Sequence, residues 1–241
     1  MVSPRTIHPV ARLEIVRWTA QMGAVTAEAL AHREQASVAS ARARLLVAVR
    51  EGLLLRAQPL LGRPALFSTT HSGMRLAGAR GLQPARISAA NAQHAIACAG
   101  AAAALERAYP DHQVMGEREL RRDEHERGAA LASACLGAVP DGTALLHRPD
   151  LVIWPPATRG LPVAVEVELT IKAPRRLASI CRAWARCACV AGVIYIAPAE
   201  VRGALERAIS DAQATERVTL IAPGGLGFDA ASLACIENHP H

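Results

Sequence analysis

The sequence predicts a mixed α and β protein with two domains, a mainly helical domain over residues 1–85 and an α/β domain over residues 86–241. With 241 residues, of which 51% are apolar, the chain can supply a core for each domain. Charge divides in the same way: residues 1–87 carry twelve Arg and four Glu, a net +8, whereas residues 88–241 carry fifteen bases and seventeen acids, a net −2. A Gly-, Pro- and Arg-rich stretch at 75–90 forms the connector.

Three helices and a β-hairpin are expected in the first domain. Apolar residues recur at helical spacing over residues 7–22, and Gly23 follows as a C-cap residue would. Thr26 is a suitable N-cap for a short helix over AEALAHRE, and a third helix is expected from Ser37 to Glu51. Two short strands around a turn containing Pro and Gly follow, and then a short fourth helix.

This order of elements is that of a winged helix-turn-helix domain, whose third helix enters the major groove of DNA. Ser37, Ser40 and Arg44 project from the polar face of that helix and are expected to approach base edges, because Arg and Ser side chains donate hydrogen bonds to them. Two alternatives remain, an ordinary solvated helix face and a protein-docking module, but the local net charge favours double-stranded DNA. Further arginines are expected to lie against phosphates: Arg33, Arg50, Arg56 and Arg63.

The second domain is expected to alternate strands with helices, which implies a partly parallel sheet covered on its faces. A long Ala-rich helix over 88–109 carries His94, and a hairpin is expected around Asp141-Gly142. The remaining expected elements are a strand from Val114 to Leu120 leading into a charged loop, strands in HRPDLVIWPP and LPVAVEVELTIK, a helix over 174–190, a strand over 192–197, a helix over 198–213 and a strand over 218–222.

The alternation in LPVAVEVELTIK places ionisable and polar side chains on one face of the expected strand. A period of two puts Glu166, Glu168, Thr170 and Lys172 on the same side, if the strand continues that far. An edge strand with a solvated face would give the same pattern. Asp150 adds to it, because an acid at the head of the apolar segment 151–154 needs a partner or a metal.

Asp150 and Glu166 on adjacent strands are candidate ligands for Mg²⁺ or Mn²⁺. Mg²⁺ binds through one or two carboxylates and keeps several waters for phosphate oxygens. A metal held there would polarise a phosphodiester and activate a water, and a nearby lysine would orient that water. These are the requirements of hydrolytic nuclease chemistry.

These segments resemble the PD-(D/E)XK nuclease superfamily. RPDLVI supplies the P-D and VEVELTIK supplies an acid and a lysine, and the element order is similar to the αβββαβ core of that superfamily. The helix with His94, followed by GEREL, RPD and EVELT-x-K after a winged helix, resembles the replication-relaxation family of plasmids and mobile elements. The resemblance implies partners among replication or mobilisation proteins.

The resemblance assigns roles residue by residue. Asp150 matches the metal-binding Asp and Glu166 the acid of the D/E-x-K step, but Glu168 stands where the lysine is expected. Lys172, the only lysine in the chain, is its stand-in if the strand continues, and arginine would not replace a compact, tunable ammonium. Glu117 in GEREL is a further candidate acid, the alternative being an exposed strand residue paired with Arg118 or Arg121.

Two functions therefore remain open. In the first, the second domain is a Mg²⁺- or Mn²⁺-dependent DNA endonuclease. In the second, the chain is a non-catalytic DNA-binding regulator or accessory factor, and Asp150, Glu166, Glu168 and Lys172 form a structural ion cluster. A homodimer is compatible with both, because winged-helix proteins often bind paired half-sites.

The cysteines and the apolar runs restrict the other classes of function. Cys181, Cys187 and Cys189 lie in a predicted apolar helical stretch without a C-x-x-C pair, so buried free thiols are expected rather than zinc ligands. No apolar run is long enough to cross a membrane, and the N-terminus lacks the apolar region of a signal peptide. A cytoplasmic protein is expected.

Overall fold

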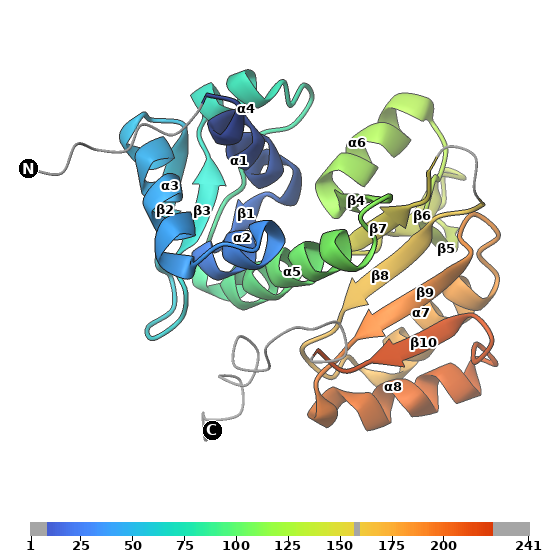
Figure 1. Ribbon diagram of the computed structural model, residues 1–241. Helices are drawn as coiled ribbons and strands as arrows, with labels where there is room; N and C mark the ends of the chain where they lie inside the picture. The colour runs from blue at the N-terminus through green and yellow to red at the C-terminus, as the bar shows by residue number, and fades with distance from the viewer. Residues whose placement is uncertain (1–8, 157–159, 224–241) are drawn as a thin grey trace, which may run out of the picture. The chain divides into compact units, whose positions relative to one another are not determined.

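The computed structural model describes residues 9–156 and 160–223 and divides the chain into two compact units, each with its own core. The first unit ends at Ala103 and the second begins at Ala104, so the division falls inside helix α5 (Ala89–Ala108) rather than near residue 85. The reason is packing: Ala99 and Ala103 are buried in the core of the first unit, which adds much of α5 to it. The two units are coloured from blue to green and from green to red in Figure 1.

The first unit contains the three expected helices. They are α1 (Pro9–Met22), α2 (Ala27–Glu34) and α3 (Val38–Arg50). The predicted N-cap is confirmed, since Thr26 Oγ1 accepts a hydrogen bond from the backbone N–H of Ala29 at 3.0 Å. A turn of two residues and the cap Ser37 join α2 to α3, and Gln35 closes α2 in the left-handed conformation at φ 53°.

A small sheet and a fourth helix complete the first unit. The expected hairpin forms from β2 (Leu54–Ala57) and β3 (Leu66–Thr69), and α4 follows at His71–Ala77. A strand that the sequence did not indicate, β1 (Ala24–Val25), pairs antiparallel with β3 and gives the order β1-β3-β2. Two residues are too few for a periodic pattern, so β1 depends on its tertiary partner.

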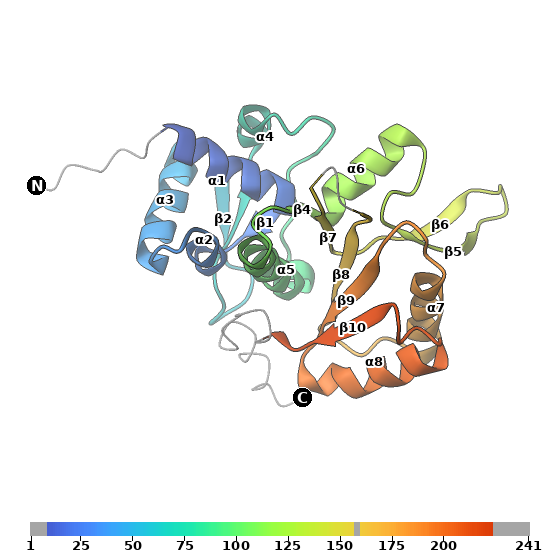
Figure 2. The ribbon, with the colours of Figure 1, turned by 45° about the vertical axis from the view of Figure 1, so that its right-hand side comes forward.

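The second unit is built on a five-stranded sheet of order β10-β9-β8-β7-β4. The strands β4 (Gln113–Gly116), β7 (Leu151–Trp154) and β8 (Val163–Val167) pair antiparallel, whereas β8, β9 (Gly192–Ile196) and β10 (Val218–Ile221) pair parallel. The parallel crossovers run through α7 (Pro174–Ala185) and α8 (Ala199–Asp211), which cover one face of this sheet in Figure 2. A mixed α and β architecture with several sheets is therefore confirmed.

Two local predictions in the second unit are wrong. The strand expected from Val114 to Leu120 ends at Gly116, and α6 (Glu117–Arg127) begins there, because two glutamates in its first turn and an ion pair between Glu117 and Arg121 favour a helix. The strand expected to reach Lys172 ends at Val167.

The hairpin expected around Asp141-Gly142 is present as β5 (Ala134–Ala138) and β6 (Ala144–His147). No described helix is long and apolar enough to cross a membrane.

Candidate functional sites

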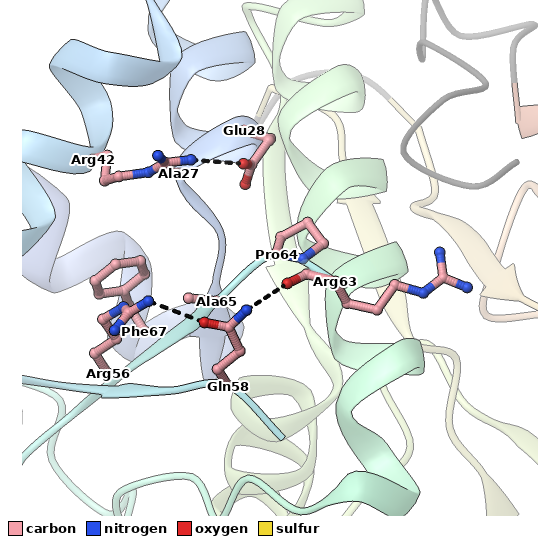
Figure 3. Close-up of a pocket in the computed structure, with 9 residues that line it drawn as sticks. All are labelled: Ala27, Glu28, Arg42, Arg56, Gln58, Arg63, Pro64, Ala65 and Phe67. Atoms are coloured by element: carbon pink, nitrogen blue, oxygen red, sulfur yellow. Dashed lines mark hydrogen bonds and ion pairs between the residues drawn. The ribbon is translucent and has the colours of Figure 1, made fainter. Parts of the chain in front are cut away.

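A basic hollow lies in the first unit where α2, α3 and the β2–β3 hairpin meet. Its volume is about 220 Å³, and Figure 3 shows the side chains that surround it. Three arginines from three elements contribute to it: Arg42 from α3, Arg56 from β2 and Arg63 from the hairpin loop. In Figure 3 the Arg63 side chain points away from Arg42 and Arg56, and Arg63 meets the hollow through its backbone carbonyl. Glu28 also lines the hollow. Because guanidinium groups present several fixed donors, Arg42 and Arg56 make this hollow a candidate site for an anion such as a phosphate oxygen.

Polar contacts fix the outline of this hollow. Arg56 Nη2 donates to Gln58 Oε1 at 3.0 Å, and Gln58 Nε2 donates to the carbonyl of Arg63 at 3.2 Å, so that Gln58 joins the two sides of the hairpin. Arg42 Nη2 lies 3.5 Å from Glu28 Oε1, and its side chain is 59% exposed. An exposed pair of this kind contributes little to stability and can be exchanged for another anion at low cost.

Arg42 was not among the residues that the sequence assigned to DNA. The helical spacing could have indicated that Arg42 is exposed. Residues 39, 42, 43 and 46 share a face of α3 opposite the buried Ala41, Leu45 and Ala48. The structure leaves that face exposed. Arg50, which the sequence did assign, is exposed at the end of the same helix.

Three of the predicted DNA contacts have structural partners inside the first unit. Ser37 is the N-cap of α3, and its Oγ accepts a hydrogen bond from the backbone N–H of Ser40 at 3.1 Å. Arg44 forms a two-pronged ion pair with Glu34, with Nη2 donating to Oε1 at 3.3 Å. The guanidinium carbon of Arg33 lies 5.1 Å from the ring centroid of Trp18, a cation–π distance. Ser37 and Ser40 remain exposed, whereas Arg33 and Arg44 are half-buried.

In the second unit the structure places Asp150 and Glu166 side by side, as the sequence predicted for adjacent strands. The register that pairs Leu151 with Val165 brings Asp150 to the end of β8, where its Oδ2 accepts a hydrogen bond from the backbone N–H of Val167 at 2.8 Å. The negative charge of Asp150 also contributes to the environment of the Glu166 carboxyl. The two carboxylates are therefore neighbours on one side of the sheet.

Glu166 is not on a solvated face. It is 5% exposed in the central strand β8, and its Oε1 lies 2.7 Å from His147 Nε2 and 3.1 Å from the indole Nε1 of Trp184, which donates to it. Burial is the main reason that the pKa of Glu166 lies above its ordinary value; the hydrogen bond from His147 opposes this, and the charge of Asp150 adds to it. The acid is thus held as part of the core beneath α7.

Sequence reasoning missed the two side chains that hold Glu166. His147 precedes Asp150 in the segment HRPD, so its closeness to the acidic strand could have been noticed. Trp184 lies on α7 and offered no such signal, because only the crossover from β8 to β9 brings that helix over Glu166. The imidazole and indole rings also meet edge to face, with centroids 5.8 Å apart.

Lys172 is close to the acidic strand despite the early end of β8. Its Nζ forms an ion pair with Glu168 Oε2, and the Glu168 side chain is only 6% exposed. Glu117, the remaining candidate acid, begins α6, pairs with Arg121 and donates its backbone N–H to the carbonyl of Asp150 at 2.9 Å. Glu168 and Glu117 are therefore both neutralised by a basic neighbour.

Asp150 and Glu166 already accept hydrogen bonds where the sequence places a Mg²⁺ or Mn²⁺ ion. An oxygen of each acid is already taken, Asp150 Oδ2 by Val167 and Glu166 Oε1 by His147 and Trp184. Among the described residues, no third His, Cys, Asp or Glu joins Asp150 and Glu166 within 4.8 Å of both. A hard cation needs exposed oxygens and bound waters, which a nearly fully buried glutamate does not supply.

In comparisons with known proteins, no model of a protein family, no curated protein and no solved structure matches the chain.

Proposed function

We propose that the chain binds double-stranded DNA through its first unit and that the second unit is a nuclease-like domain without catalysis. We interpret the first unit as a winged helix-turn-helix, with α3 as the helix for the major groove and the β2–β3 hairpin as the wing. The observation that carries the proposal is the hollow between these two elements, which Arg42 and Arg56 line, with the Arg63 side chain projecting outward from its edge (Figure 3). A phosphate of the DNA backbone matches its charge and the fixed donors of its arginines.

Exposure indicates most of the DNA-facing residues. Arg42 and Arg50 on α3 and Arg56 on β2 are exposed and would contact phosphates, together with the half-buried Arg63 at the edge of the hollow. Ser40 is an exposed polar residue in the first turn of α3 and would approach base edges. Arg44 and Ser37 would act indirectly, because the first holds α3 to α2 through Glu34 and the second caps α3. The net +8 of residues 1–87 supports attraction to a polyanion.

The interpretation of the second unit as a PD-(D/E)XK fold is supported by its strand order. Three antiparallel strands, a crossover helix and a parallel strand match the βββαβ part of that core. The buried, hydrogen-bonded state of Glu166 and the pairing of Glu168 with Lys172 favour the non-catalytic alternative. An accessory role with replication or mobilisation proteins, or as a homodimer, would suit such a domain.

DNA binding is tested by fluorescence anisotropy with a labelled random-sequence duplex at several salt concentrations. The double variant Arg56→Ala, Arg63→Ala is expected to weaken binding by about tenfold or more and to flatten the salt dependence by about two charges. Arg75→Ala, an exposed arginine on α4 in the same unit, is the matched control and should leave both quantities unchanged. Equal effects of the two changes would contradict the proposed interface.

The nuclease alternative is tested by incubating plasmid DNA with the native chain or with Asp150→Ala in the presence of Mg²⁺ or Mn²⁺. We expect no cleavage by either chain. Cleavage by the native chain that Asp150→Ala abolishes would overturn the non-catalytic assignment and leave the DNA-binding assignment standing.

A further inference from the structure

A group of thiols lies in the second unit, apart from the acidic strand. Cys187 and Cys189 follow α7, and their sulfur atoms are 3.0 Å apart. The expectation of buried free thiols is confirmed for Cys181 and Cys187, whereas Cys189 is partly exposed. The expected helix ends early, so only Cys181 lies in α7. The exposed Cys135 on β5 lies at the same hollow as this pair. Cys235 lies outside the described residues.

The thiol pair opens into a hollow of about 540 Å³. Ser133, Cys135, Arg186, Cys187 and Cys189 contribute to its wall. Both cysteines of the pair therefore line a hollow that is open to solvent, although Cys187 itself is only 8% exposed.

The buried Ser133 lines the same hollow as the thiol pair. Ser133 is 3% exposed, and among the described residues its Oγ has no hydrogen-bond partner. Its carbonyl is occupied, because the sulfur atoms of Cys187 and Cys189 approach it at 3.7 and 3.6 Å. A buried hydroxyl without a partner is costly, so a hydrogen-bonding group that enters the hollow together with a ligand of the thiols would stabilise this position.

The backbone that carries the pair is held in place. Arg217 donates from Nη2 to the carbonyl of Val190 at 2.8 Å and also to the carbonyl of Cys187. The thiols of Cys187 and Cys189 also lie within hydrogen-bond distance of each other, which holds the two sulfurs together.

We infer that Cys187 and Cys189 form a binding site for a soft, thiophilic monovalent cation, with Cu(I) as the fitting example. Thiolate ligands select soft metals, and Cu(I) accepts two sulfur ligands. Structural Zn²⁺ needs four ligands, and among the described residues no group of three or more His, Cys, Asp or Glu ligands includes either cysteine. The two sulfurs, now 3.0 Å apart, would move apart to admit the cation between them, and the protons of both thiols would pass to solvent.

The test is anaerobic titration of the full chain with Cu(I) against a coloured chelator, with a phosphine as reductant. The native chain is expected to hold one Cu(I), and Cys187→Ser and Cys189→Ser are each expected to lose it. Cys135→Ser is the matched control, because this thiol lies at the same hollow but its Sγ approaches the carbonyl of Gly137 at 3.3 Å. Loss of copper in Cys135→Ser, or its retention in Cys187→Ser, would overturn the assignment.

A second measurement on the native chain avoids variants that fail to fold. Bound Cu(I) is expected to protect Cys187 and Cys189, but not Cys135, from alkylation by iodoacetamide, as mapped by mass spectrometry. Equal alkylation of the pair with and without Cu(I), or a chain that takes up Zn²⁺ and refuses Cu(I), would contradict the inference.

Discussion

Glu166 Oε1 lies 2.7 Å from His147 Nε2, and this contact joins the central strand β8 to the end of the β5–β6 hairpin. Trp184 donates to the same oxygen from α7, so one buried carboxyl ties together a sheet, a hairpin and a helix. Such a carboxyl is a core element whose charge is costly. Replacing Glu166 by glutamine, an amide of the same shape without a charge, therefore separates the structural role of this side chain from a catalytic role of its charge.

Glu166→Gln is expected to change the pH dependence of stability. Because the pKa of Glu166 is raised in the folded chain, its favourable contribution is complete below the ordinary range of a glutamate and is lost as the pH rises through the raised pKa. The amide keeps an oxygen that accepts from Trp184 and carries no charge. The variant should therefore gain stability relative to the native chain as the pH rises from the ordinary range of a glutamate through the raised pKa.

Urea unfolding followed by circular dichroism at several pH values measures this difference. Glu206→Gln, on the exposed face of α8, is the matched control, expected to stay within about 0.5 kcal/mol of the native chain at every pH. A loss of stability in Glu166→Gln that grows as the pH rises would show that the ionised carboxylate is the form that the core requires.

Arg44 and Arg42 are expected to respond differently to replacement by alanine. Arg44→Ala should lower the free energy of unfolding by about 1 kcal/mol, because its half-buried pair with Glu34 joins α2 to α3. Arg42→Ala should leave stability nearly unchanged and weaken DNA binding more than Arg44→Ala does. Thermal unfolding and anisotropy on the same samples measure both effects, and the reverse order of DNA affinities would assign the contact to Arg44.

The coupling between Arg44 and Glu34 can be measured separately. Arg44→Ala and Glu34→Ala together should cost less than the sum of the two single changes, because each single change already breaks the pair. Additive costs would contradict the ion pair.

Ser37 and Ser40 offer a matched pair of small exposed residues. Ser37→Ala removes the side-chain acceptor at the start of α3 and should cost about 1 kcal/mol. Ser40→Ala keeps the backbone N–H that donates in this cap, so it should cost less than about 0.5 kcal/mol. Thermal unfolding distinguishes them, and equal costs would show that the cap adds nothing to the stability of α3.

Gly73 in α4 is expected to tolerate no side chain. A Cβ atom there would lie 2.1 Å from the carbonyl oxygen of Leu53, and backbone atoms cannot move aside without disturbing the sheet. Gly73→Ala should therefore lower stability by about 2 kcal/mol or more. The neighbouring exposed Ser72→Ala is the control, with an expected change below about 0.5 kcal/mol, and similar thermal midpoints for the two variants would contradict the close packing.

Local sequence determined those elements of this protein whose signals are local. Thr26 caps α2 as its position predicts, and the Asp141-Gly142 turn lies between β5 and β6, because caps and turns depend on residues within a few positions. The closeness of Asp150 and Glu166 also followed from the sequence, since alternation along two adjacent strands fixes which side chains share a face.

Tertiary structure decided what those side chains do. The strand pattern could not show that Glu166 is buried, because the same alternation suits an edge strand and only the parallel pairing with β9 and the cover of α7 make β8 central. Nor could spacing bring Arg42, Arg56 and Arg63 around one hollow, or Ser133 beside Cys187 and Cys189. These residues lie far apart in the chain, so their meeting depends on packing between elements, which local periodicity does not encode.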